Sequence, residues 1–128
     1  KLRESLLVAF FLGGLVTLGG PQKWWLEPLL SQLNPSQLFW GTTALTAITD
    51  NAALTYLGTL APDLSLPAKY ALVAGAVTGG GLTVIANAPN PAGYGLLRES
   101  FGEDGINPLL LLSAALPYTL ITAVVFLL

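Results

Sequence analysis

The sequence lacks cysteine, histidine and methionine, and it carries few charges. Only 9% of its 128 residues are charged, against about 25% in a soluble domain. The absence of cysteine excludes disulfides, thiolate nucleophiles and Cys-based metal sites. The absence of histidine removes the usual general base and the imidazole ligand. No basic cluster is present to bind nucleic acid, so we expect neither an enzyme nor a nucleic-acid-binding protein.

What remains is mostly apolar. Hydrophobic residues make up 53% of the chain, in long runs that contain almost no charge. Such runs are typical of membrane-spanning helices, which need about 20 apolar residues each. We therefore predict an all-α integral membrane protein. Because the chain opens at Lys1 and contains no Met, we expect it to be a fragment of a longer chain.

Charges, prolines and glycines divide the chain into segments. Trp24 and Trp25 stand beside Lys23, a composition typical of the membrane–water interface. A short interfacial helix is therefore predicted over residues 25–33, with a plain loop as the alternative. The predicted membrane segments are a span at about residues 5–20, a re-entrant hairpin at 36–61, a broken span at 69–101 and a last span at 106–128.

Asp50 is the only charged side chain between residues 36 and 62. A charge at the bilayer centre costs about 2.5–3.5 kcal/mol on insertion scales, so an intramembrane carboxylate indicates a function. A straight helix here would make one tilted span of roughly 40 Å, whereas a fold at Asp50 would make two arms of roughly 20 Å. We favour the hairpin, because irregular backbone at that depth lets Asp50 and Asn51 face a cavity. The alternative role for Asp50 is a helix N-cap or a loop residue.

A second interruption lies at residues 87–93, which read NAPNPAG. Its prolines remove backbone donors and clash with a preceding helical turn, so the helix is predicted to break here and to resume near Tyr94. Two broken apolar segments with polar groups indicate a transporter binding site. Upstream, Ala71, Gly75 and Gly79 fall four residues apart, a spacing that lets another helix approach closely. The predicted structural breaks are Gly81, Pro89 and Pro91.

The two breaks offer oxygen ligands, which suit hard cations. A carboxylate such as Asp50 can hold either a proton or a small cation, and this competition is the minimal chemistry of cation/proton exchange. Helix N-termini starting near Ala52 and Tyr94 could instead attract an anion, so both substrate classes stay open here. The predicted ion-site residues are Thr49, Asp50, Asn51, Asn87, Ala88 and Asn90.

Two stretches carry a family resemblance: ITDNAALTYLG at residues 48–58 and GGGLTVIANAPNPAG at residues 79–93. They resemble the ion-transporter superfamily of NhaD-type sodium/proton antiporters, arsenite permeases and divalent-anion/sodium symporters. The closest resemblance is to bacterial sodium/proton antiporters. Members of the superfamily contain two inverted repeats, each with a re-entrant hairpin and a discontinuous transmembrane helix. The order of segments here resembles one repeat, the C-terminal half of a secondary transporter.

The resemblance implies ion-site roles for the Thr49-Asp50-Asn51 tip and for residues 87–90 in the break. It implies sodium/proton antiport in a multi-pass protein of the bacterial inner membrane, with no cofactor beyond a sodium ion at Asp50. The expected partners are the lipid bilayer, the missing N-terminal repeat and a second copy in a homodimer. Symporters of the family carry Ser-Asn-Thr tips, so the carboxylate favours an antiporter. The alternatives are an anion transporter or symporter (for arsenite or a carboxylate) and a non-transporting membrane assembly subunit.

Overall fold

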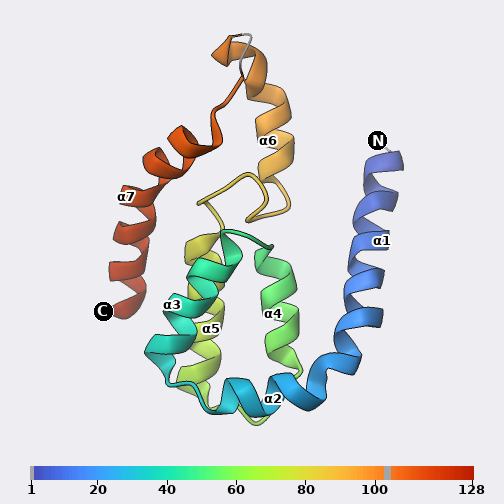
Figure 1. The fold of residues 1–128 in the computed structure, drawn as a ribbon, viewed down its shortest axis with the longest axis vertical. Helices are drawn as coiled ribbons and strands as arrows, with labels where there is room; N and C mark the ends of the chain where they lie inside the picture. Colours follow the sequence, from blue (N-terminus) through green and yellow to red (C-terminus); the bar gives the residue numbers. More distant parts are fainter. Residues whose placement is uncertain (1, 103–104) are drawn as a thin grey trace.

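The computed structural model describes residues 2–102 and 105–128, and these residues form helices joined by turns, without a strand. Figure 1 shows the path of the chain. The helix α1 runs toward α2, which lies across one end of the molecule. From that end α3 runs toward the middle of the molecule, α4 runs back, and α5 runs toward the middle again. The chain then continues through α6 to the opposite end, and α7 returns beside α5. The elements are α1 (Leu2–Gly19), η1 (Gly20–Gln22), α2 (Lys23–Ser31), α3 (Pro35–Thr46), α4 (Asn51–Thr59), α5 (Leu66–Gly79), α6 (Asn90–Leu97), η2 (Arg98–Phe101) and α7 (Pro108–Leu127).

The short helix after the first long one is present, two residues earlier than predicted. It spans Lys23–Ser31 rather than residues 25–33, because Gly20–Gln22 keep helical backbone angles and lead directly into it. Pro21 fits the first turn of η1, where its missing amide hydrogen would have no partner. Trp25 donates to Gln22 at 2.7 Å, and Lys23 lies 3.8 Å from Glu27. These local contacts start the helix earlier than the apolar pattern suggested.

Residues 36–61 form two antiparallel helices and not one straight helix. Asn34 caps α3 through a capping box with Gln37, and Pro35 takes the first helical position. The chain turns back over residues 47–50, and α4 descends beside α3 (Figure 1). The fold at Asp50 is therefore confirmed as a reversal of the chain.

The core lies between α3 and α5, where small residues bring the two backbones close. Gly75 and Gly79 are buried, and a methyl group on Gly75 would collide with the Thr42 hydroxyl and the Phe39 carbonyl. The Thr43 hydroxyl bridges the pair, with distances of 2.8 Å to the Phe39 oxygen and 3.1 Å to the Gly75 oxygen. The predicted close packing along the Ala71, Gly75 and Gly79 face is confirmed.

Much of the remaining apolar surface is exposed. Phe10 on α1 is 76% exposed and Leu109 on α7 is 75% exposed. The stretches Ser5–Ser31 and Pro108–Leu127 are long and apolar enough to cross a membrane, judged by length and composition. Burying such large side chains in a nonpolar medium is favourable by about 1.5–3 kcal/mol each. The exposed apolar surface and the two long apolar helices are consistent with a membrane protein.

Candidate functional site

Asp50 ends the turn between α3 and α4 and caps the start of α4. Its backbone is extended (φ −148°, ψ 141°), and its Oδ1 accepts hydrogen bonds from the amides of Ala52 at 2.8 Å and Ala53 at 3.1 Å. An aspartate in this position satisfies amides that the first helical turn leaves without partners. The side chain is half-buried, and its second oxygen, Oδ2, makes no hydrogen bond within the described part of the chain. The structure shows the alternative role of Asp50, that of a helix N-cap, and this role leaves Oδ2 available for a ligand.

The second interruption is longer than predicted and begins earlier. The helix α5 ends at Gly79, and irregular backbone continues to Pro89, so the break covers residues 80–89 rather than 87–93. Three consecutive glycines start it, because glycine is a poor helix former and leaves the backbone free to turn. Pro91 lies inside the first turn of α6, where proline is well tolerated. The predicted break at Pro91 and the restart near Tyr94 are therefore wrong, since α6 begins at Asn90.

Asn90 holds the break in shape. Its Nδ2 donates to the carbonyl oxygens of Gly80 and Thr83, both at 2.8 Å. The side chain of Asn90, the first residue of α6, thus binds both Gly80 at the start of the break and Thr83 within it. Both carbonyls lie outside helices, so these bonds replace partners that a helix would have supplied. The amide donors of Asn90 are used for structure, and its Oδ1 stays available.

The hairpin tip and the break lie against each other. The backbone amide of Asn51 donates to the Ala86 oxygen at 3.1 Å, and the Thr83 hydroxyl donates to the Ala47 oxygen at 2.7 Å. A methyl group on Gly80 would lie 3.2 Å from the Asn51 side-chain nitrogen. In Figure 1 both irregular stretches sit midway along the molecule, between the α2 end and the η2 end. The fold therefore brings together two segments that are far apart in sequence.

The remaining predicted site residues differ in what they can offer. Asn87 is half-buried, and its side-chain amide makes no hydrogen bond with the described residues. The Thr49 hydroxyl donates to the Leu45 oxygen at 2.7 Å, and the residue is exposed. Ala88 is exposed and offers only backbone groups. The breaks at Gly81 and Pro89 lie within the irregular stretch, as predicted.

Two threonines outside the predicted ion site also belong to this region. Thr83 links the break to the tip through the bond to Ala47 described above. Thr46, in the last turn of α3, is 0% exposed, and its hydroxyl has no hydrogen-bond partner among the described residues. Thr42, Thr43 and Thr78 by contrast each donate to the carbonyl four residues earlier. Nothing in the sequence distinguishes Thr46 from these neighbours.

The tip and the break together offer one carboxylate, side-chain amide oxygens and backbone carbonyl oxygens. No group of three or more His, Cys, Asp or Glu side chains is present in the described ranges, so a transition-metal cluster is not indicated there. The free oxygens at the tip suit a hard cation. The positive end of α4 is already occupied by the Asp50 carboxylate, which would repel a second anion. The geometry favours a cation over an anion.

Comparisons with known proteins agree with this chemistry. A family model described as "Putative Na+/H+ antiporter" matches residues 1–128, the whole chain. No curated protein and no solved structure matches the chain.

Proposed function

Since the chain belongs to the family of putative Na+/H+ antiporters, we propose that it forms part of a secondary transporter that exchanges sodium for protons at Asp50. The observation that carries this proposal is the contact between the tip and the break, at 3.1 Å from the Asn51 amide to the Ala86 oxygen. It brings the only carboxylate of the apolar hairpin beside a stretch of irregular backbone. The competing ligands are a proton and a sodium ion, and Asp50 holds one at a time.

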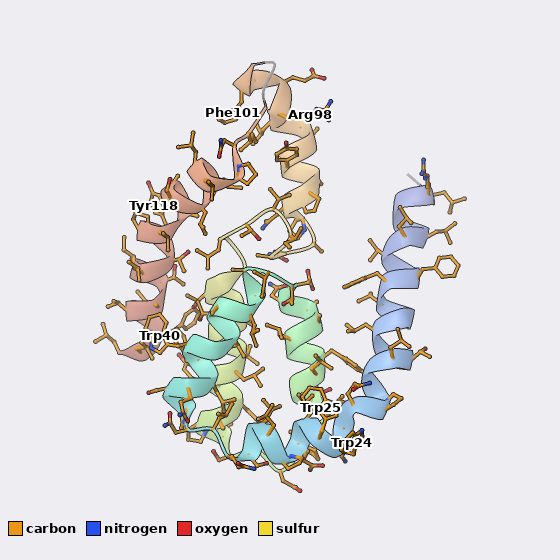
Figure 2. All side chains as sticks on the ribbon, viewed as in Figure 1. Trp24, Trp25, Trp40, Arg98, Phe101 and Tyr118 are labelled. Carbon is orange, nitrogen blue, oxygen red and sulfur yellow. The ribbon has the colours of Figure 1, made fainter. Side chains whose placement is uncertain are left out.

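The membrane placement is part of the proposal. The α3–α4 pair is a re-entrant hairpin, and α5 and α6 are two halves of a discontinuous span, so that the tip and the break lie at bilayer depth. Figure 2 supports this orientation, because Trp24 and Trp25 lie at one end of the molecule and Arg98 and Phe101 at the other. Irregular backbone at that depth is tolerated only where protein or a cavity covers it. An inverted N-terminal repeat supplies that cover, in a multi-pass protein of the bacterial inner membrane.

The roles of the residues follow from their contacts. Asp50 binds the cation through Oδ2, while Oδ1 remains on the α4 amides. The side-chain oxygens of Asn51 and Asn87 complete the protein's share of the coordination, because neither side-chain amide makes a hydrogen bond with the described residues. Asn90 positions the break. Protonation of Asp50 removes its charge and releases the cation, and sodium binding displaces the proton in turn.

The test is Asp50→Asn in the full-length transporter, reconstituted in vesicles. Asparagine caps helices about as well as aspartate, so α4 keeps its start while the site loses its charge. We expect sodium-dependent proton exchange to be lost and the thermal stability to be retained. The matched control is Asp63→Asn, because Asp63 is exposed in the loop before α5. Exchange that survives in the Asp50 variant, or is lost equally in the control, contradicts the assignment.

A further inference from the structure

A second polar region lies between α5 and α7, away from Asp50. It is a cleft of about 410 Å³, and we call it the α5–α7 cleft. Near the start of α5, the Tyr70 hydroxyl donates to the Phe126 oxygen at 3.2 Å and links α5 to α7. Near the end of α5, the cleft extends to Gly81. The cleft is lined by Thr78, Gly81, Tyr118, Thr119 and Thr122, together with small apolar residues.

The threonines on this face differ in how their hydroxyls are satisfied. The helix α7 is otherwise apolar enough to span a membrane. The hydroxyls of Thr78 and Thr122 donate to helix carbonyls at 2.7 and 2.9 Å. Thr119 is 7% exposed, and its hydroxyl makes no hydrogen bond with the described residues although it lines the cleft. Because this hydroxyl borders the cleft, water there would supply the partner that the described residues do not.

The α5–α7 cleft and the break both border Gly81. A second cavity, of about 280 Å³, is lined by Thr83, Asn90 and Tyr94, and it shares Gly81 with the α5–α7 cleft. Gly81 is exposed, and a methyl group placed on it would meet no atom within 4 Å. Gly81 therefore stands between the two cavities, with open space beside it, next to the residues that shape the break.

We propose that the α5–α7 cleft is a hydrated access route through which water and small cations reach the break at Gly81. This inference rests on the proposed function, because the break that the cleft borders packs against the tip that carries Asp50. The ligand class is water and a hydrated monovalent cation, held weakly by hydroxyls and not by charge. Several water molecules fit in the volume, at about 30 Å³ each. Gly81 keeps the junction open because it has no side chain.

The first test measures hydration directly and does not depend on transport. Thr119→Cys and Leu120→Cys are made separately in the full-length transporter, whose section described here has no native cysteine. Each variant is treated in vesicles with a charged methanethiosulfonate reagent, which reacts with the thiolate that forms only in contact with water. Leu120 is the matched control, since it is the next residue on α7 and is exposed outside the cleft. Unsubstituted protein corrects for thiols elsewhere.

We expect the thiol at position 119 to react at least about tenfold faster than the one at position 120, because an apolar environment suppresses the thiolate. If both cysteine variants react slowly, lipid or protein fills the cleft. If both react equally fast, water contacts the whole of this part of α7 and not the cleft in particular. Either outcome overturns the proposal. Loss of the proposed antiport activity would leave this comparison readable, so the two failures are distinguishable.

The second test closes the route. Gly81→Leu places a large side chain at the junction, and Gly95→Leu adds the same side chain on α6. At both positions the added Cβ would meet no atom within 4 Å. We expect the Gly81 variant to lose sodium exchange and the Gly95 variant to retain it. If a folded Gly81→Leu variant exchanges sodium at the unsubstituted rate, the α5–α7 cleft is not the access route. If that variant does not fold, the cysteine-labelling experiment tests the proposal instead.

Discussion

Replacing Asn90 by alanine tests whether one side chain holds the break together. The substitution removes both donors of the Nδ2 group, and with them the 2.8 Å hydrogen bonds to the carbonyls of Gly80 and Thr83. The backbone bond from the Asn90 amide to the Asn87 oxygen, at 3.0 Å, is unaffected. Gly80 is buried, so its carbonyl has little access to water as a substitute. The variant therefore changes the tie between α5 and α6 and little else.

The expected loss can be worked out from these two bonds. A hydrogen bond in a membrane protein contributes about 0.6 kcal/mol on average, and one in a soluble protein about 1 kcal/mol. Two bonds therefore give about 1–2 kcal/mol, a roughly 5- to 30-fold change in the folding equilibrium. Asn90→Asp keeps the shape but places an oxygen against both carbonyls, so we expect it to be at least as destabilising.

The assay is equilibrium unfolding of the purified full-length transporter in mixed micelles of increasing SDS content. Asn87→Ala is the matched control, because it deletes the same amide group three residues away, where that group makes no hydrogen bond in the described chain. We expect the control to unfold within about 0.5 kcal/mol of the unsubstituted protein. Equal stability of the Asn90 variant and the unsubstituted protein, or equal destabilisation of both variants, would refute the reasoning.

Two further predictions concern the packing of α3 on α5. Gly75→Ala should destabilise the protein by about 1–3 kcal/mol, because the added methyl group would collide with the Thr42 hydroxyl and the Phe39 carbonyl. The control is Gly13→Ala on α1, where the methyl group enters open space and should not destabilise the protein. Thermal unfolding of both variants measures the difference. Thr46→Val removes a buried hydroxyl that has no partner among the described residues, so stability should be unchanged or increased. A loss of more than about 1 kcal/mol in the valine variant would show that this hydroxyl binds something the described residues do not supply.

The chain reversal at Asp50 could be predicted from the sequence, with a helix cap as the alternative role of that residue, because both depend on local signals. A single charge in a long apolar run marks Asp50, and aspartate is among the residues that favour helix starts. Asn34 and Pro35 mark the start of α3 in the same way. The glycine spacing on α5 indicates close packing regardless of the partner, and the structure supplies α3 as that partner.

The shape of the break could not be predicted, because it depends on bonds between residues distant in sequence. Prolines drew attention to residues 87–93, but the helix ends at Gly79, where glycines and not prolines release the backbone. The bonds from Asn90 to Gly80 and from Thr83 to Ala47 exist only once the chain has turned back on itself. The same limit applies to Thr46 and Thr119, whose lack of a partner is a property of their surroundings.

The carboxylate of Asp50 caps α4 and, on the proposed function, also binds the cation. These two roles link ion binding to the structure of the helix. Its Oδ1 neutralises the amide dipoles of the first turn of α4, which favour a negative charge nearby. A proton or a cation arriving on the same group reduces that charge and weakens the hold on the turn. On the proposed function, loading and unloading would therefore tighten and loosen the beginning of a helix directly. The signal for movement would start in the side chain that carries the ion, with no relay in between.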